Sequence, residues 1–169
     1  MEYRTPHVLF LFVIVFYFGV FLNDYSHAQL IDPRQSVPGW TENCISCICE
    51  ASSGCNETVG CIEGNYCGMF LIGEEYWRDA DSPVLDGDDP SRPKAFERCA
   101  LDPFCTSKAV NRYIQKFAQD CNRDRFVNCD DHVRLHYLGR TQCSIRIQHL
   151  PYYQTFQNCM RQLTTESRG

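Results

Sequence analysis

Several features that would point to common functions are missing from this 169-residue sequence. Arginine and lysine are scattered among carboxylates in a chain of net charge −5, so no basic stripe could follow a nucleic-acid backbone. The acidic stretch 79–93 lacks the carboxylate spacing of a calcium-binding helix-loop-helix motif. The sequence contains no internal repeat and no low-complexity tract. We therefore exclude nucleic acid as a partner and expect neither a metal nor another cofactor.

A second long apolar segment is also missing, since the run Val8 to Leu22 is not followed by another. This run is shorter than the roughly 20 residues that a membrane-spanning helix requires. It follows Arg4 and precedes Ser26-His27-Ala28, a small-residue cleavage pattern typical of a secretory signal peptide. We expect residues 1–28 to be a signal peptide. Residues 29–169 should then form one secreted, extracellular domain without a membrane anchor.

All twelve cysteines lie after this segment. A secreted chain passes through an oxidising compartment, so up to six disulfides can form, although spacing alone does not determine their pairing. Such cross-links stabilise small domains by about 2–4 kcal/mol each. We interpret Cys44-x-x-Cys47 in the same way and not as a zinc or redox motif. The predicted disulfide cysteines are Cys44, Cys47, Cys49, Cys55, Cys61, Cys67, Cys99, Cys105, Cys121, Cys129, Cys143 and Cys159.

The pattern of apolar residues predicts a mainly helical domain with a small sheet. Thr41 can cap a first helix that Gly54 ends, and glycines between residues 55 and 72 indicate short strands, with Phe70 and Ile72 alternating as in a strand. Asp102-Pro103 predicts the start of a core helix. The apolar stripe of this helix consists of Val110, Tyr113, Ile114 and Phe117. We also predict a weaker helix at residues 133–138 and a last helix that starts at Pro151. Residues 79–93 should form a solvated loop.

The cysteine pattern carries a family resemblance. Cys44-Ile45-Ser46-Cys47-Ile48-Cys49, then Ser53-Gly54-Cys55, Gly60-Cys61 and Cys67 to Ile72, resembles the invertebrate-type lysozymes, also called the destabilase family. Tyr76-Trp77-Arg78-Asp79 resembles a further family element, and the match extends through Cys99, Cys105, residues 113–117 and Leu135-His136 to Cys143. One departure is Ala109, which stands where the family has another cysteine.

The resemblance implies a small disulfide-rich α+β domain with a short antiparallel sheet and a glycan cleft. It also implies hydrolysis of the β-1,4 bond between N-acetylmuramic acid and N-acetylglucosamine in peptidoglycan. That reaction needs two carboxyl groups that flank the scissile bond, one protonated and one ionised.

Both carboxyl positions of the family are substituted in this chain. Ser52 stands where cleaving members have the acidic glutamate, and Gly64 where they have an aspartate. A serine hydroxyl is far too weak an acid to replace a carboxylic acid, so we expect weakened or lost hydrolysis. Glu50 and Glu63 are candidate substitutes. However, Glu50 is turned by about 200° from Ser52 along a helix, and a one-residue slip turns Glu63 to the opposite face of an extended segment.

Other residues are candidates for binding and modification. Tyr66, Tyr76 and Trp77 are rings on which a sugar could stack, unless they belong to the core. Asn56-Glu57-Thr58 is an N-glycosylation sequon. Some family members are credited with peptidase action, for which Ser107 would have to pair with Lys108 or His136. Adjacent helical residues diverge by about 100°, and we favour structural roles for all three.

Two functions from different classes follow. The first is a secreted monomer that binds peptidoglycan or a related amino-sugar glycan, in immunity or gut physiology, without cleaving it. The alternative is an active antibacterial or digestive lysozyme that uses Glu50 or Glu63, which requires two carboxyl groups within about 5–10 Å across a cleft. A third hypothesis, a peptidase, requires a hydrogen bond between Ser107 and His136.

Overall fold

The computed structural model describes residues 40–62 and 65–166. The predicted signal peptide and the positions Glu63 and Gly64 lie outside the described residues. Within the described ranges, no helix combines the length and the apolar character needed to cross a bilayer.

The described chain forms six helices and one antiparallel sheet, which confirms the predicted α+β, mainly helical fold class. The three strands lie in the order β1-β2-β3, with Cys61 opposite Cys67 and Tyr66 opposite Gly73. In chain order the elements are α2 (Trp40–Ser53), β1 (Cys61–Ile62), β2 (Tyr66–Cys67), β3 (Ile72–Gly73), α3 (Glu74–Asp79), α4 (Ala95–Leu101), α5 (Pro103–Lys116), α6 (Cys129–Leu138) and α7 (Pro151–Glu166).

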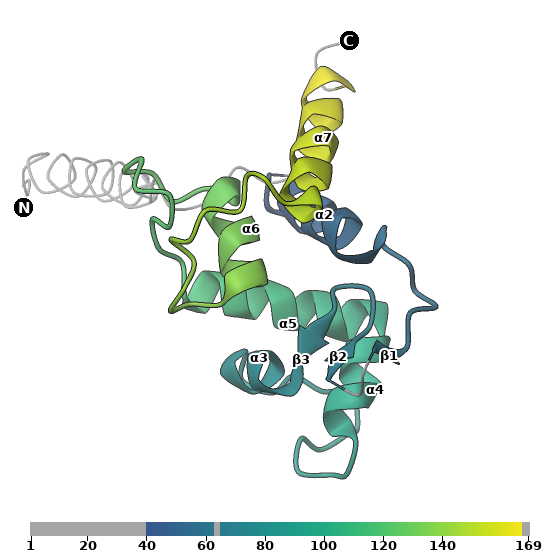
Figure 1. The fold of residues 1–169 in the computed structure, drawn as a ribbon. Coiled ribbons are helices and arrows are strands. Elements are labelled where there is room, and N and C mark those ends of the chain that lie inside the picture. The colour runs from purple at the N-terminus through teal and green to yellow at the C-terminus, as the bar shows by residue number, and fades with distance from the viewer. Residues whose placement is uncertain (1–39, 63–64, 167–169) are drawn as a thin grey trace, which may run out of the picture. The chain divides into compact units, whose positions relative to one another are not determined.

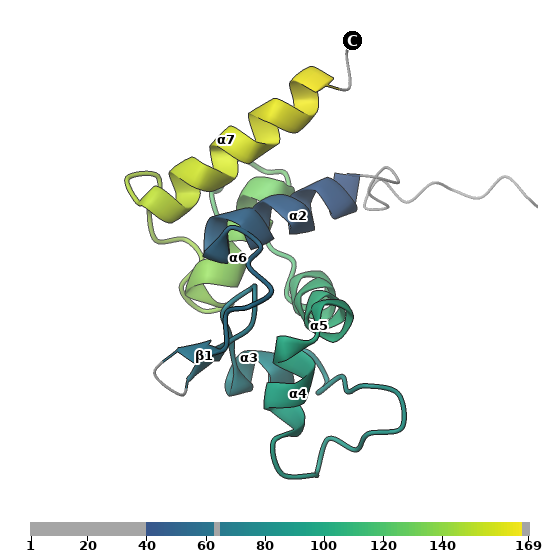
Figure 2. The same cartoon turned by 90° about the vertical axis from the view of Figure 1, so that its right-hand side faces the viewer.

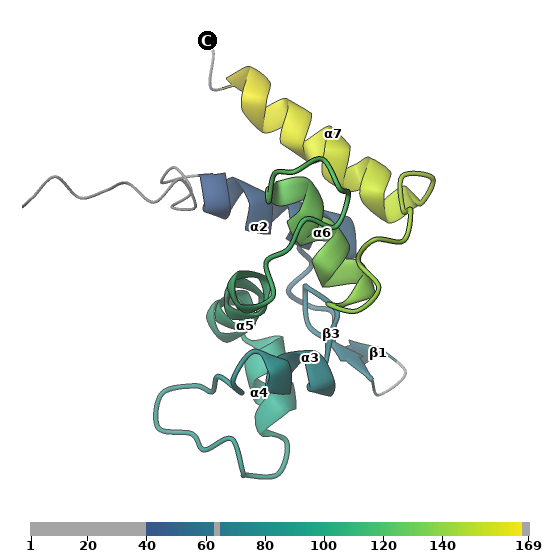
Figure 3. The ribbon, with the colours of Figure 1, turned by 90° about the vertical axis from the view of Figure 1, so that its left-hand side faces the viewer.

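Helix α5 lies between two groups of elements (Figure 1). On one side it contacts α2 and α6, and α7 packs along α2, as Figures 2 and 3 show from two sides. On the other side it contacts α3 and α4, which adjoin the sheet. The core between these elements includes Ile48, Phe70, Val110, Leu135 and Phe156 as fully buried side chains. One continuous core therefore connects the sheet to the α2–α7 pair.

The predicted core helix is confirmed as α5. The Asp102 carboxylate accepts a hydrogen bond from the Cys105 N–H at 2.8 Å, and Pro103 occupies the first turn. Val110, Tyr113 and Ile114 are buried, as the apolar stripe predicts, and Phe117 packs against them at the end of the helix. Helix α7 begins at Pro151, as predicted.

Helix α6 begins at Cys129, four residues before its predicted start at Val133. A capping box produces this early start: Asn128 accepts from the Asp130 N–H, and the Asp131 side chain accepts from the Asn128 N–H. The polar run Asp130-Asp131-His132 interrupts the apolar period and conceals this turn from the sequence pattern.

The first helix and the sheet differ in detail from expectation. Helix α2 already includes Trp40, so Thr41 lies inside the helix and is not its cap. Gly54 does end α2, because its φ of +68° breaks the helical path. Phe70 lies in the turn before β3, not in a strand, and its side chain is buried in the core. The predicted loop at residues 79–93 is confirmed apart from Asp79, the last residue of α3.

Six disulfides cross-link the described chain. Two of them leave α2 one turn apart and fix it to α6 and α7, and three others join cysteines six residues apart. The pairs are Cys44–Cys129, Cys47–Cys159, Cys49–Cys55, Cys61–Cys67, Cys99–Cys105 and Cys121–Cys143.

Removing the Cys47–Cys159 bridge should destabilise the protein more than removing a short-range bridge. The two cysteines are 112 residues apart in sequence, whereas Cys61 and Cys67 are six apart. Because the Cys44–Cys129 bridge remains, the Cys47–Cys159 bridge closes an effective loop of roughly 30 residues, for which loop-closure entropy predicts a loss of about 4 kcal/mol in Cys47→Ala/Cys159→Ala. The corresponding loss for Cys61→Ala/Cys67→Ala is about 2 kcal/mol. Urea unfolding of both double variants measures the difference, and equal losses would contradict the prediction.

Candidate functional site

Ser52 lies on the last turn of α2 with a half-buried side chain. Its hydroxyl donates to the Ile48 carbonyl at 2.8 Å, and its oxygen lies 3.4 Å from Nε2 of His136 on α6. Glu50, two residues earlier, is exposed. The two side chains therefore occupy different faces of α2, as the helical rotation predicts.

The tautomer of His136 follows from its hydrogen bonds. Nε2 lies 3.0 Å from the Phe70 carbonyl, which can only accept, so Nε2 carries the proton. Nδ1 therefore accepts from the Tyr76 hydroxyl at 3.1 Å. Burial lowers the pKa of His136 to about 4, opposed by the hydrogen bond to the Phe70 carbonyl, so the ring is neutral at neutral pH. His136 thus donates toward Ser52 and cannot serve as its base.

Tyr76 and Trp77 both belong to the packing of the domain. The Tyr76 ring stacks on Tyr113 with centroids 3.8 Å apart, and burial raises the pKa of Tyr76 well above its usual value. Trp77 is only 3% exposed, and its indole N–H donates to the Pro83 carbonyl at 2.7 Å. Trp77 consequently offers no free ring face to a sugar, which corrects the expectation for this residue. Tyr66, on β2, is 53% exposed.

Tyr152 on α7 completes the surroundings of Ser52. Its hydroxyl is buried and has no hydrogen-bond partner among the described residues. Burial raises the pKa of Tyr152, and the nearby Ser52 hydroxyl opposes that rise. A buried hydroxyl donor without an acceptor is costly, commonly by about 1–3 kcal/mol. The Tyr152 hydroxyl therefore lies near Ser52 without a well-formed hydrogen bond as a donor.

The residues of the peptidase hypothesis are not brought together by a hydrogen bond in the described structure. Ser107 donates to the Pro103 carbonyl at 2.7 Å within α5, and Lys108 is exposed. The serine that contacts His136 is Ser52. Because Nε2 of His136 carries a proton and the Ser52 proton points to Ile48, this serine is not activated as a nucleophile.

A carboxyl group with a raised pKa, Asp131, occupies the opposite end of α6. Burial raises its pKa, although its oxygens accept hydrogen bonds from the N–H groups of Asn128, Asn122 and Cys121. Its side chain is 1% exposed, so no substrate reaches it. Asp131 therefore organises the chain and is not placed to donate a proton to a substrate.

The structure also describes the sequon at Asn56 and the alanine at position 109. Asn56 is exposed in the loop between α2 and β1, where its side-chain oxygen accepts from the Thr58 N–H at 2.9 Å and from the Thr58 hydroxyl at 2.7 Å. Its glycosylation remains a prediction. Ala109 is fully buried in the core, and Cys105 pairs with Cys99.

The helices, the small sheet and the cross-links define a disulfide-rich domain of lysozyme-like class. A model of the family "Destabilase" matches residues 41–159, and the chain belongs to this family.

The curated relatives carry lysozyme names. The chain is 32% identical to a lysozyme of Magallana gigas over 59% of this chain and 66% of that protein. It is 30% identical to a lysozyme of Meretrix lusoria over 61% of this chain and 77% of that protein. The first of these matches spans about two thirds of the length of the Magallana protein.

Solved structures agree with this family. A crystal structure of Meretrix lusoria lysozyme in complex with Aeromonas hydrophila PliI superposes with a TM-score of 0.54 and 28% identity, over 69% of this chain and 88% of that one. Tapes japonica lysozyme gives a TM-score of 0.52 and 29% identity, over 69% and 87% of the two chains. The sheet and the helices around Ser52 thus belong to a fold shared with invertebrate-type lysozymes.

Acidification should destabilise the wild-type protein through His136. The pKa of His136 is about 4 in the folded protein, below the value of 6.5 in the unfolded chain. Between these two pH values the unfolded chain binds more protons, so the free energy of unfolding decreases as the pH is lowered. Between pH 7 and pH 5 this group alone should cost about 2 kcal/mol. His136→Gln cannot titrate, and its own loss over this interval should be smaller by that amount. Urea unfolding at both pH values measures it.

His132 remains in both proteins, and burial lowers its pKa to about 4 as well, so its contribution cancels in the comparison. Identical pH dependence of wild type and His136→Gln would contradict the neutral, buried state of His136.

Proposed function

We propose that this protein is a secreted member of the destabilase family that binds peptidoglycan, or a related amino-sugar glycan, without hydrolysing it. The observation that carries the proposal is the state of Ser52. Ser52 stands at the position where the resemblance puts the catalytic glutamate. Its hydroxyl donates a hydrogen bond to the Ile48 carbonyl and faces the N–H of the neutral His136 ring.

No group around Ser52 supplies the missing acid. General acid catalysis needs a proton donor whose pKa lies near the working pH and that reaches the glycosidic oxygen. The pKa of His136 is too low for its ring to be charged at neutral pH, and the pKa of Tyr152 is raised by burial. Glu50 is exposed on another face of α2. The chemical step therefore lacks a donor among the described neighbours of Ser52.

Binding can survive the loss of the acid because the scaffold is intact. Tyr66 on β2 and Ile62 on β1 are 53% and 47% exposed, so the sheet carries apolar area and a phenol tip to the surface. An exposed aromatic ring is a suitable platform for the apolar face of a sugar. The assignment of peptidoglycan as the glycan rests on the family resemblance and on the lysozyme names of the relatives.

An extracellular location is part of the same proposal. Six disulfides within the described residues are typical of chains that fold in an oxidising compartment. Residues 1–28 supply the signal peptide and residues 29–169 the secreted domain in this proposal.

The purified protein should be retained on insoluble peptidoglycan but should not clear a suspension of it. Ser52→Ala should behave identically in both assays, because Ser52 has no catalytic part. Ser52→Glu/Gly64→Asp restores the family carboxyl positions, and the buried Tyr152 hydroxyl lies near position 52. This double variant should begin to clear the suspension, since general acid catalysis contributes about 10²–10⁴ in rate.

Clearance by the unmodified protein would contradict the proposal and favour the alternative, an active lysozyme. Glu50→Gln and Glu63→Gln then identify the replacement acid, because the variant that loses clearance carries it. Absence of both retention and clearance would overturn the binding function.

Tyr66→Ala should weaken retention on peptidoglycan by several-fold if the sheet carries the sugar contact, because stacked aromatic rings contribute about 0.5–1.5 kcal/mol beyond buried area. Phe104→Ala is the matched control, since Phe104 is an 86% exposed aromatic side chain on the first turn of α5. A pull-down that compares the bound fractions of both variants measures the effect. Equal losses for both variants would remove Tyr66 from the binding surface.

A further inference from the structure

A second candidate site lies on a different face of α6. A cavity of about 710 Å³ opens among the loop at residues 121–123, the segment at residues 144–149 and α6. Its lining includes Arg123, Arg134, Arg146 and His149, and the described residues that line it include no aspartate or glutamate. Arg134 and His136 are two residues apart on α6, a rotation of about 200°, so this cavity faces away from Ser52.

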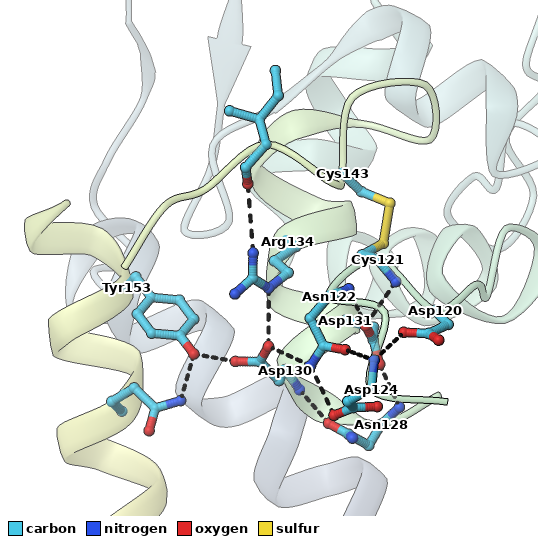
Figure 4. Close-up of polar contacts among 12 residues, drawn as sticks. Asp120, Cys121, Asn122, Asp124, Asn128, Asp130, Asp131, Arg134, Cys143 and Tyr153 are labelled. Carbon is cyan, nitrogen blue, oxygen red and sulfur yellow. Dashed lines mark hydrogen bonds and ion pairs between the residues drawn. A yellow bond between two sulfur atoms is a disulfide. The ribbon is translucent and has the colours of Figure 1, made fainter. Parts of the chain in front are cut away.

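Arg134 forms a buried, oriented donor in this cavity. Its side chain is 3% exposed, its Nε donates to Asp130 at 2.9 Å, and its guanidinium lies 5.5 Å from the Tyr153 ring (Figure 4). Nη1 reaches the Ile145 carbonyl at 3.5 Å. A side-chain hydrogen bond from Arg134 also opposes the raised pKa of Tyr153, which leaves two of the five N–H groups of the guanidinium. The guanidinium therefore keeps unused N–H donors at a fixed position.

The positive charge of the cavity is not fully compensated within the described structure. Asp130 balances Arg134: burial opposes its ionisation, but hydrogen bonds from Tyr153, Arg134 and Asn122 lower its pKa. Neither Arg123 nor Arg146 forms an ion pair or a side-chain hydrogen bond with another described residue. Both guanidinium groups are exposed and can form hydrogen bonds with a ligand.

The loop that carries Arg123 is held in place by its own acidic side chains. Asp120 accepts from the N–H groups of Asp124 and Arg125, and Asp131 accepts from those of Cys121 and Asn122 (Figure 4). The Cys121–Cys143 disulfide ties this loop to the segment that carries Arg146. The backbone of the cavity walls is thus organised before any ligand arrives, and only the exposed Arg123 and Arg146 side chains remain to be ordered on binding.

We propose that this cavity binds a small organic phosphate monoester. Such a group carries about −1.5 to −2 charges near pH 7, which suits two guanidinium groups that have no ion-pair partner among the described residues. Guanidinium forks also bind phosphate oxygens in a bidentate manner. A single carboxylate would leave one of the two charges unmatched. The volume exceeds that of one phosphate and leaves room for an attached glycerol- or sugar-sized group. This assignment does not depend on the proposed glycan binding.

A ¹⁵N NMR titration of the purified protein with glycerol 3-phosphate tests the assignment. Saturable shifts should centre on the amides of residues 121–123 and 144–149 and should weaken with added salt. Glycerol, which lacks the phosphate, should produce no such shifts, and D-alanyl-D-alanine, a carboxylate probe, should bind more weakly than glycerol 3-phosphate. Absence of saturable shifts, or tighter binding of the dipeptide, would overturn the phosphate assignment.

Arg146→Gln should raise the dissociation constant for glycerol 3-phosphate by about tenfold, because it removes charge-assisted hydrogen bonds. Arg125→Gln is the matched control: it removes one guanidinium charge from the neighbouring loop that carries Arg123, but Arg125 does not line the cavity. The Arg125 variant should bind as the wild type does. Equal weakening in both variants would show a non-specific charge effect and would overturn the site.

Discussion

The cross-linking of α2 is the constraint on which the rest of the structure depends. Cys44 and Cys47 leave one face of the helix, one turn apart, and bond it to α6 and α7. Ser52, on the last turn of the same helix, is thereby brought against His136 of α6 and near Tyr152 of α7. In a small domain that buries limited surface, covalent bonds supply part of the precision with which such side chains are positioned.

The polar chain around Ser52 is structural in its present form. The direction of its hydrogen bonds is fixed at His136. The Phe70 carbonyl accepts from Nε2, which therefore carries the ring proton, and the Tyr76 hydroxyl donates to Nδ1. Every proton of this chain except that of Tyr152 already has an acceptor. A neutral, fully engaged histidine stabilises the contact between α6, the turn before β3 and α3, and it offers no chemistry to a substrate. Under the proposed function, the lysozyme-like scaffold is retained around a centre without a catalytic acid.

Strong local signals made parts of the fold predictable. Asp102-Pro103 and Pro151 locate the starts of α5 and α7, since a cap and a first-turn proline act within one turn. Helices α3 and α4 were not predicted, because both are short and α4 follows a residue, Lys94, with left-handed backbone conformation. The contact between Ser52 and His136 joins residues 84 positions apart, and no local pattern encodes such a pair. Disulfide pairing was likewise beyond the sequence pattern.

The most direct test of this account is the protonation state of the His136 ring, measured from its ¹⁵N chemical shifts during a pH titration. The account predicts a neutral ring with its proton on Nε2 and a pKa of about 4. A proton on Nδ1, together with a pKa near the usual value for histidine, would leave Nε2 free to accept the Ser52 proton. That result would contradict the inert centre and would make Ser52 a candidate nucleophile.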